Sequence, residues 1–447
     1  MASIAFATIF FKFGISCRQS KICLMDFRRI LPIFVIVFTN ILGAGVILPI
    51  LPLVAEGQFG ASAFQATSLG AVFFAAQFLA APWLGRLSDH FGRRPVLIVS
   101  QIGTVFSFIL FALAAPLGQY FDSIGAGLGM SGGLFILYLA RTLDGITGGN
   151  ITTAQAYISD ISTEENRAQA LGTLSAAFGI GFIFGPAFGG ILAEVSLTAP
   201  FIGAAIITTG SVLLTTFTLK ESLPPEARTQ TKRGQKQDSA WKYLKTPTIL
   251  LIFAITFTST LAFSALQSTF ALYADRVIFP DAANAARVAR NVGLLLTVIG
   301  VFTVITQAVM IKPLVKNYGE RNVVLLGQAS LILAFIGFSI ATQVWAVALI
   351  GPLVAFGNGV SQPSLQSLIT RFGSRQDQGQ LLGLYQSARS FALILGPIGA
   401  GYAFQAISPR APYAIAVPLI SIAFLLGVAL KHHSIPSQQM QPQQIGD

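Results

Sequence analysis

Between two long apolar runs lies the stretch Gly85-Arg86-Leu87-Ser88-Asp89-His90-Phe91-Gly92-Arg93-Arg94-Pro95. Its glycines permit backbone conformations and close approaches that a Cβ atom would block, and Pro95 suits the first position of a helix. Asp89 can stabilise a helix N-terminus, where the backbone dipoles present positive charge. Arginines alone would keep a loop on one side of a membrane, whereas Gly, Asp and Pro at these spacings add a structural constraint. We therefore predict a structured loop between two membrane-spanning helices.

The composition is that of an integral membrane protein. The 447 residues are 53% hydrophobic and only 10% charged, with a mean hydropathy of +0.71, whereas a soluble domain carries roughly 25% charged residues. The net charge of +11 could indicate a nucleic-acid partner, but the cations lie between apolar runs, where membrane topology needs them. We expect a lipid bilayer as the partner of this chain, and no nucleic acid.

The sequence contains no pattern for a metal, a cofactor or an enzymatic reaction. Cys17 and Cys23 both precede the first apolar run, and the three histidines have no metal-ligand spacing. We find no phosphate-binding G-x-x-x-x-G-K-[ST] loop and no H-E-x-x-H pair. We therefore expect no metal, no cofactor and no ATP-driven pump.

The apolar runs predict an all-α membrane protein with twelve transmembrane helices. A helix needs about 20 apolar residues to cross a bilayer. The candidate spans are residues 31–54, 65–84, 95–115, 131–154, 168–193, 199–219, 248–273, 292–314, 322–342, 344–370, 380–406 and 411–430.

The distribution of charge orients these spans, because Lys and Arg favour the cytoplasmic side. With twelve spans, one side of the membrane holds Arg86, Arg93, Arg94, Arg167, Lys316, Arg321, Arg371 and Arg375. The other side holds Glu56, Asp122, Glu194 and the mixed-charge segment 275–290. We expect a monomeric multi-pass protein of the inner (plasma) membrane, with both termini in the cytoplasm.

The spans divide the chain into five segments. These are an N-terminal extension (1–29), an N-terminal six-helix half (30–219), a cytoplasmic linker (220–247), a C-terminal six-helix half (248–430) and a cytoplasmic tail (431–447). Met25 is an alternative start, because residues 26–29 would then form a compact basic leader.

The two halves repeat each other. Leu171-Gly172 is followed by Gly185-Pro186 and Gly190, and the same pattern recurs 211 residues later, from Leu382-Gly383 to Gly401. A weaker echo pairs residues 91–94 with residues 318–321. Two related six-helix halves are one plan of secondary transporters, which bind their substrate between the halves near the membrane midplane.

The fourth span carries two charges inside an apolar run. Arg141 and Asp144 share a helix face at i and i+3 and can pair, although each charge costs about 2.5–3.5 kcal/mol at membrane depth. A carboxyl group here can take up and release a proton. The alternative is a static ion pair that only sets helix packing.

The fifth span carries a glycine string, from Gly179 to Gly190. Its key positions are Gly181, Gly185, Pro186, Gly189 and Gly190. Glycines let neighbouring helices approach closely in lipid, and Pro186 is expected to bend the helix. One GxxxG pair would be a weak signal, whereas the whole string predicts a tightly packed helix.

Arg389, in the eleventh span, is a third deep charge and has no acid within one helical turn. It must face a cavity, a partner helix or an anionic ligand. Further polar candidates for the lining of a cavity are Asn40, Gln77, Gln155, Gln267, Asn358, Gln362 and Gln366. Each of these amides alone is more often a helix-packing contact than a ligand.

Together these motifs resemble the twelve-span drug:proton antiporters of the major facilitator superfamily, in particular the tetracycline-exporter-like branch. The match runs from about Ile33 to Phe404 and includes residues 43–49, 85–95, 157–160 and 179–190. The resemblance implies that the stretch 85–95 acts as a latch between conformational states. It also implies that Asp160 pairs with the latch arginines, with Arg93 as the candidate, and that the glycine string is an antiporter motif.

The chain departs from that branch at two acidic positions. The tetracycline exporters carry an acid three residues before the Gly-x-Gly of the first span, where this chain has Asn40. They carry another acid in the third span, and residues 101–108 contain none. The resemblance therefore implies the fold and the mode of coupling, but not a metal–tetracycline chelate as cargo.

The sequence favours a transporter that exports small, partly apolar molecules by alternating access, driven by proton entry. The first alternative is uptake of a metabolite or organic anion, with Arg389 as the partner of the anion. The second alternative, of another class, is a membrane receptor or scaffold that does not transport. Such a protein would not need both the stretch 85–95 and the glycine string of the fifth span to be intact.

Overall fold

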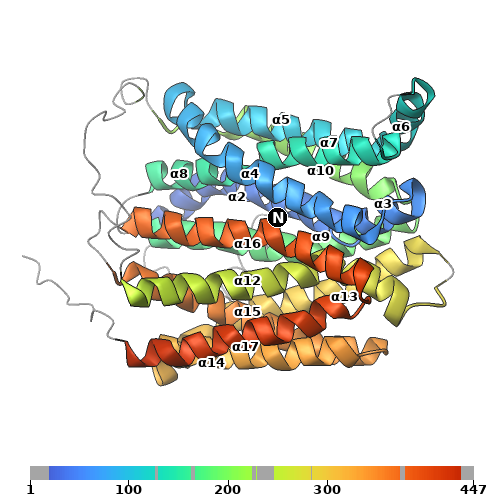
Figure 1. Cartoon of the computed structure of the whole chain (residues 1–447). Helices are drawn as coiled ribbons and strands as arrows, with labels where there is room; N and C mark the ends of the chain where they lie inside the picture. The colour runs from blue at the N-terminus through green and yellow to red at the C-terminus, as the bar shows by residue number, and fades with distance from the viewer. Residues whose placement is uncertain are drawn as a thin grey trace, which may run out of the picture.

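The computed structural model describes residues 20–125, 129–162, 167–223, 228, 246–282, 284–372 and 378–433. In these ranges every regular element is a helix, and the helices run side by side through one bundle (Figure 1). Most of the predicted N-terminal extension, linker and C-terminal tail lies outside the described residues.

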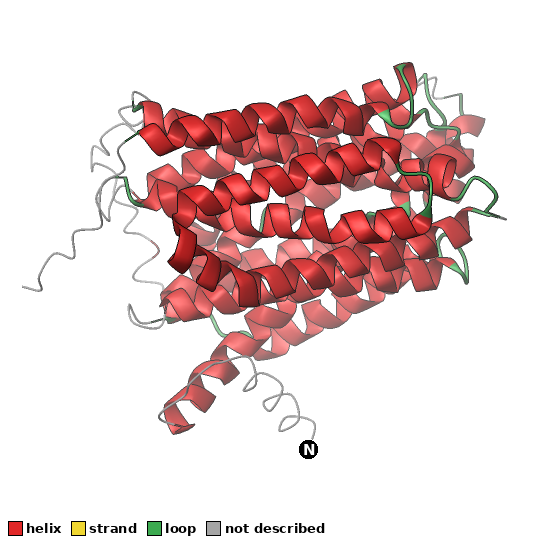
Figure 2. Cartoon of the chain, turned by 90° about the horizontal axis from the view of Figure 1, so that it is seen from below, coloured by secondary structure: helices red, strands yellow, loops and turns green. Residues whose placement is uncertain are grey.

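The helices fall into two consecutive groups. The N-terminal half comprises α2 (Ser20–Ile47), α3 (Leu51–Phe59), α4 (Ala63–Phe91), α5 (Arg93–Ala112), α6 (Ala114–Ser123), α7 (Gly132–Gly148), α8 (Ile151–Ile161), α9 (Arg167–Ala193) and α10 (Ala199–Thr218). The C-terminal half comprises α12 (Pro247–Tyr273), η2 (Ala274–Ile278), α13 (Ala285–Ile305), η3 (Thr306–Met310), α14 (Ile311–Ile340), α15 (Val344–Thr370), α16 (Gln378–Ala406) and α17 (Ala411–His432). Helices account for nearly all of the described residues (Figure 2).

Length and composition alone identify seven helices in the described residues that could cross a membrane. An eighth forms if Pro32–Ile47 and Leu51–Phe59, which meet at 40°, are one bent span. The segment Ala285–Ile340 is 56 residues long and is interrupted at Gly319, so it contains two of the predicted spans. The other predicted spans correspond to α9, of which Ala177–Ala193 is a shorter apolar helix, to α16, and to the pair α7–α8, which is broken at Gly149.

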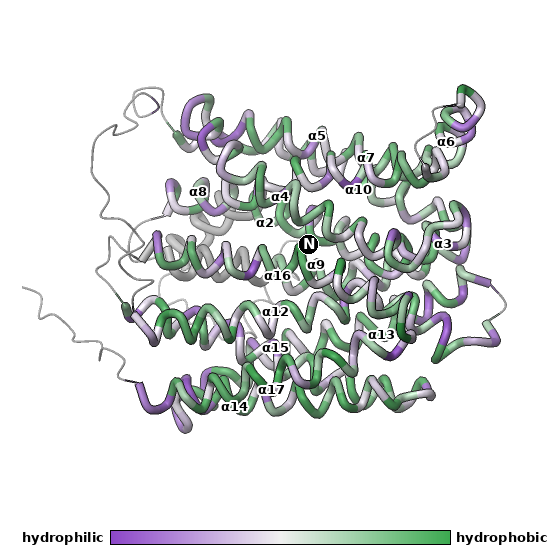
Figure 3. The backbone as a smooth tube through the Cα atoms, in the orientation of Figure 1, coloured by the Kyte–Doolittle hydropathy of each residue, from purple (hydrophilic) through white to green (hydrophobic). Residues whose placement is uncertain are grey.

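This arrangement is the predicted twelve-helix membrane fold with two pseudo-symmetric halves. Apolar residues dominate the middle of the bundle, and hydrophilic residues gather at its two ends (Figure 3). Within the N-terminal half α2 packs on α9, α4 on α7 and α5 on α10, and within the C-terminal half α12 packs on α16 and α14 on α15. The halves meet chiefly where α9 packs on α13 and α4 packs on α16.

Local signals explain where α4 begins. Ser62 precedes the helix and its hydroxyl accepts a hydrogen bond from the backbone N–H of Gln65, while the side chain of Gln65 accepts one from the N–H of Ser62. This reciprocal capping satisfies two donors that the first helical turn would otherwise leave free. The helix then runs without interruption to Phe91, at the other end of the bundle.

Candidate functional site

The predicted loop between the second and third spans is almost entirely helical. Only Gly92 leaves the helical conformation, with φ of 103°, and α5 begins at the next residue. Two details of the prediction are therefore wrong. Gly85 lies within α4 with open space where a Cβ atom would be, so no close approach requires a glycine there, and Pro95 is the third residue of α5 and not its first.

The side chain of Arg93 joins three elements at this corner. It forms ion pairs with Asp89, one turn earlier in the chain, and with Asp160 at the end of α8, where Nε and Oδ2 are 3.2 Å apart. It also donates to the hydroxyl of Ser88 at 2.7 Å. Arg94 donates to the carbonyl of Thr216 near the end of α10, at 2.6 Å. The structure thus brings α4, α5, α8 and α10 together through two arginines.

The N-terminus of α5 is stabilised by Glu221 and not by Asp89. The carboxylate of Glu221 accepts hydrogen bonds from the backbone N–H groups of Arg93 at 2.9 Å and of Arg94 at 3.2 Å. Asp89 lies in the last turn of α4, so the prediction that it stabilises a helix N-terminus is wrong. Sequence reasoning missed Glu221, because it lies more than a hundred residues away at the start of the predicted linker.

A second corner of the same kind lies in the C-terminal half. Gly319 has φ of 75° and interrupts α14, and Glu320 follows it as Arg93 follows Gly92. Glu320 forms an ion pair with Arg371 at 2.7 Å and accepts a hydrogen bond from Ser367. Arg371 lies at the end of α15, 211 residues after Asp160. The two corners therefore share a geometry, but their charges are reversed.

We call the end of the bundle that holds these corners the latch end. At the opposite end, ion pairs connect the two halves. Arg276 of η2 binds both carboxylate oxygens of Glu56 in α3 at 3.0 Å and lies over the ring of Phe404. Arg290 of α13 binds Glu194 just after α9 at 2.7 Å. At the latch end, the ion pairs among the described residues stay within one half.

Arg141 and Asp144 form an ion pair inside the N-terminal half. Arg141 Nη1 and Asp144 Oδ2 are 3.1 Å apart, and their side chains are only 10% and 8% exposed. The guanidinium also lies 5.1 Å from the ring centre of Phe73 and 5.8 Å from that of Phe111. Burial of both partners and the aromatic faces around the cation keep water away from this pair.

Hydrogen bonds link the residues that follow this pair in the chain to two neighbouring helices. The amide of Asn40 in α2 donates to Asn150 at 2.9 Å, and Gln77 of α4 donates to the carbonyl of Gly148 at 3.0 Å. Asn150 was not among the predicted lining residues, although the polar pair Gly149-Asn150 in an apolar run was a signal for it. Gln155 is exposed on α8 and makes no side-chain hydrogen bond in the described part of the chain.

The predicted polar residues of the C-terminal half behave differently from one another. Gln362 of α15 donates to Thr260 at 3.1 Å and accepts from the hydroxyl of Tyr385 at 2.9 Å, and sequence reasoning missed both partners. Arg389 forms no ion pair with any described residue. Side-chain hydrogen bonds within the described ranges are also absent for Gln267, Asn358 and Gln366.

The glycine string of α9 contacts two different helices. Ideal Cβ atoms at Gly181, Gly185 and Gly189 would lie 3.0 Å or less from atoms of α2 and its C-terminal end. An ideal Cβ atom at Gly190 would lie 3.0 Å from the backbone of α13, and α9 continues through Pro186. One stripe of small residues therefore packs inside the N-terminal half, and another packs against the C-terminal half.

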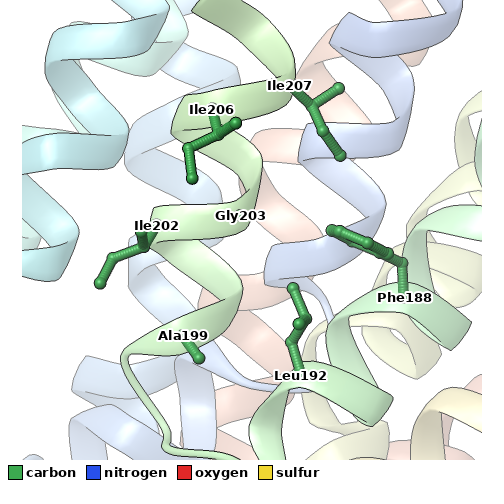
Figure 4. Close-up of a pocket in the computed structure, with 7 residues that line it drawn as sticks. All are labelled: Phe188, Leu192, Ala199, Ile202, Gly203, Ile206 and Ile207. Atoms are coloured by element: carbon green, nitrogen blue, oxygen red, sulfur yellow. The ribbon is translucent and has the colours of Figure 1, made fainter.

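A groove of about 340 Å³ lies between α9 and α10. Figure 4 shows its lining, which consists of Phe188, Leu192, Ala199, Ile202, Gly203, Ile206 and Ile207. None of these side chains is polar, and none belongs to the predicted site. Over the residues that the structure describes, no group of three or more His, Cys, Asp or Glu side chains could hold a metal ion.

Known proteins match this chain along most of its length. The sequence profile of the Major Facilitator Superfamily matches residues 33–286 and 278–444. The chain belongs to the major facilitator superfamily. Within the superfamily it is 32% identical over 360 residues to the tetracycline resistance protein, class C, of Escherichia coli, which covers 80% of this chain and 84% of that protein. It is 28% identical to multidrug resistance protein 2 of Bacillus subtilis (strain 168), over 83% of this chain and 89% of that protein.

Solved structures support the same fold. The human organic anion transporter MFSD10 superposes with a TM-score of 0.64 at 21% identity, over 90% of this chain and 99% of that one. A bacterial homolog of the human lysosomal transporter Spinster, solved in an inward-facing and occupied conformation, gives a TM-score of 0.68 at 16% identity, over 92% and 98%. Membership of the major facilitator superfamily makes this chain a multi-pass membrane transporter of small molecules and not an enzyme.

Proposed function

We propose that this transporter exports small, partly apolar molecules in exchange for protons, by alternating access. The observation that carries the proposal is a buried carboxyl group, Asp144, paired with a buried arginine in a chain whose relatives are named as tetracycline and multidrug resistance proteins. Each proton that enters through a potential of 100 mV yields about 2.3 kcal/mol. One or two protons per cycle can therefore support a useful outward gradient.

Asp144 is the group that takes up and releases the proton. Antiport needs a side chain that is alternately protonated and ionised, and arginine stays charged at all relevant pH values. When water reaches the site, Arg141 favours the ionised carboxylate. When the proton binds, the carboxyl group becomes neutral and releases Arg141 for other contacts. Asn40, Gln77 and Asn150 connect this change to α2 and α4.

The ion pairs at the two ends of the bundle support alternating access. The pairs of Glu56 with Arg276 and of Glu194 with Arg290 connect the two halves at the opposite end. The latch-end pairs Arg93–Asp160 and Glu320–Arg371 leave the halves free to separate there. A transporter in this arrangement offers its site to the latch end, and breaking the cross-half pairs is required for the other state.

The latch end is the cytoplasmic end in this proposal, because the loops rich in Arg and Lys lie there. Both termini are then cytoplasmic, and the protein is a monomer of the inner (plasma) membrane. The units of transport are the six-helix halves 30–219 and 248–430, joined by the linker 220–247. The resemblance to the tetracycline exporters does not extend to a metal–tetracycline chelate as cargo, because Asn40 stands where those exporters carry an acid.

A reconstitution experiment tests the function directly. The full-length chain is placed in proteoliposomes with an acidic lumen, so that protons leave as the substrate enters, and the accumulation of ethidium and other drugs in the lumen is followed by fluorescence. We expect accumulation that collapses when a protonophore removes the gradient. Downhill flux that does not respond to the proton gradient would indicate a uniporter and not an antiporter. No flux of any compound would favour the receptor or scaffold alternative.

A further inference from the structure

Arg389 is a membrane-depth cation for which the described part of the chain provides no counter-ion. It lies about 16 Å from the start of α16, at 1.5 Å per residue, and far from either end of that helix. Its Nε atom is buried and has no hydrogen-bond partner. Arg141, the other deep cation, is neutralised by Asp144 at 3.1 Å. The remaining charge in the middle of the bundle is therefore positive and belongs to Arg389.

The surroundings of Arg389 are polar and fixed in place. Tyr385 lies one turn earlier on the same face of α16, within electrostatic range of the guanidinium. Its hydroxyl donates to the side-chain oxygen of Gln362 at 2.9 Å, and the amide of Gln362 donates to Thr260 at 3.1 Å. Residues from α12, α15 and α16 thus hold one another in position beside a guanidinium whose donors are available.

The same turn of α16 lies at the boundary between the two halves. Phe391, two residues after Arg389, contacts Phe78 of α4 with ring centres 5.2 Å apart. Further along, Gly401 packs against Thr67 of α4. Residues two apart on a helix point in different directions, so the contact of Phe391 places the turn of α16 that carries Arg389 at the boundary between the halves without putting a ring beside the guanidinium.

We propose that Arg389 recognises the carboxylate, or a similar anionic group, of a substrate that binds between the halves. A planar guanidinium can bind a carboxylate with two parallel hydrogen bonds, which gives both strength and orientation. A singly charged cargo neutralises the one unbalanced charge among the described residues of the membrane interior. This assignment rests on the proposed export function and adds a preference for anionic over neutral or cationic cargo at this position.

Binding of two dyes of opposite charge to the purified full-length protein tests the assignment. Fluorescein carries the anionic group and ethidium is a cation of similar aromatic size, and fluorescence anisotropy gives a Kd for each. We expect R389Q to weaken fluorescein binding at least tenfold and to change the ethidium Kd less than twofold, with R389K in between. The control is R287Q, which removes one positive charge at an exposed position of α13 and should change neither Kd.

Several results would overturn the assignment. These are an equal loss for both dyes, an unchanged fluorescein Kd in R389Q, and no fluorescein binding by the unaltered protein. If R389Q does not fold, Tyr385→Phe provides a second test, because loss of the hydroxyl should weaken fluorescein binding about threefold and leave ethidium unaffected.

Transport by the same protein in proteoliposomes separates this inference from the proposed function. If fluorescein binding depends on Arg389 but neither dye shows proton-driven flux, the anion site is supported and the proposed export function is contradicted. If ethidium is exported in response to protons but fluorescein binding does not change in R389Q, the export function is supported and the anion site is contradicted.

Discussion

At the latch end, the two halves of the transporter turn the chain in the same way and then hold the turn with opposite charges. In the N-terminal half Gly92 precedes Arg93, which pairs with Asp160. In the C-terminal half Gly319 precedes Glu320, which pairs with Arg371. The comparison teaches that the same glycine turn and the same contact form with either order of the two charges.

The halves also differ at membrane depth. The N-terminal half contains a paired acid and base, Arg141 and Asp144, whereas the C-terminal half contains the single cation Arg389. A carboxyl group is thus deep in only one half of the described structure. In the mechanism proposed above, the N-terminal half handles the proton and the C-terminal half handles the charge of the cargo.

The largest effect that we expect comes from removing the acid that distinguishes the N-terminal half. Asp144→Asn should reduce export against a concentration gradient more than a hundredfold, because the amide cannot exchange a proton, while some downhill flux remains. Uptake of ethidium into proteoliposomes with and without a pH gradient measures both quantities. Asp281→Asn, at an exposed position, is the matched control. If the Asp144 variant still concentrates ethidium, Asp144 is only a structural partner of Arg141.

The second prediction converts one corner into the other. Asp160→Arg alone should slow transport about tenfold, equivalent to ~1.4 kcal/mol, because it places two arginines together. Arg93→Glu combined with Asp160→Arg reproduces the charge order of the C-terminal corner and should recover part of the loss. Recovery stays partial because Asp89 also faces position 93. A double variant as slow as the sum of its single changes would show that the two positions are not coupled.

The third prediction compares the two glycines. Both have positive φ, so alanine at either position costs about 1–3 kcal/mol of backbone strain. A Cβ atom at position 92 would also collide with the carboxylate of Glu221, whereas position 319 has open space around it. Gly92→Ala should therefore lower the Tm in detergent more than Gly319→Ala does. Equal shifts would mean that Glu221 moves aside freely.

The smallest effects should come from the pairs that join the halves at the opposite end. Exposed ion pairs contribute about 0–1 kcal/mol, and Glu194 and Arg290 are each about half exposed. Glu56→Gln should raise the accessibility of a cysteine placed at the opposite end up to about fivefold, since Glu56 is the more buried acid. Glu194→Gln should change it less than twofold. A larger response from Glu194 would reverse this ranking of the two contacts.

Sequence patterns predicted the fold because long apolar runs, alternate clusters of arginine and a 211-residue repeat all agree. They also predicted that Arg141 and Asp144 could pair, since the spacing of i and i+3 on one helix fixes that contact. The roles of Glu221, Asn150 and Tyr385 were missed, because each depends on a helix distant in the chain. A spacing rule describes one helix, and it carries no information about which helices become neighbours.

The glycine stripe on α9 has a mechanical consequence. Where α9 meets α13, Gly190 and Gly293 bring the two backbones together, and no large side chain projects across the contact at these positions. Interlocked side chains would have to disengage before either helix could move, and each step would cross a barrier. At Gly190 and Gly293 no such step is needed, so a tilt of α13 against α9 meets least resistance at this point of the contact.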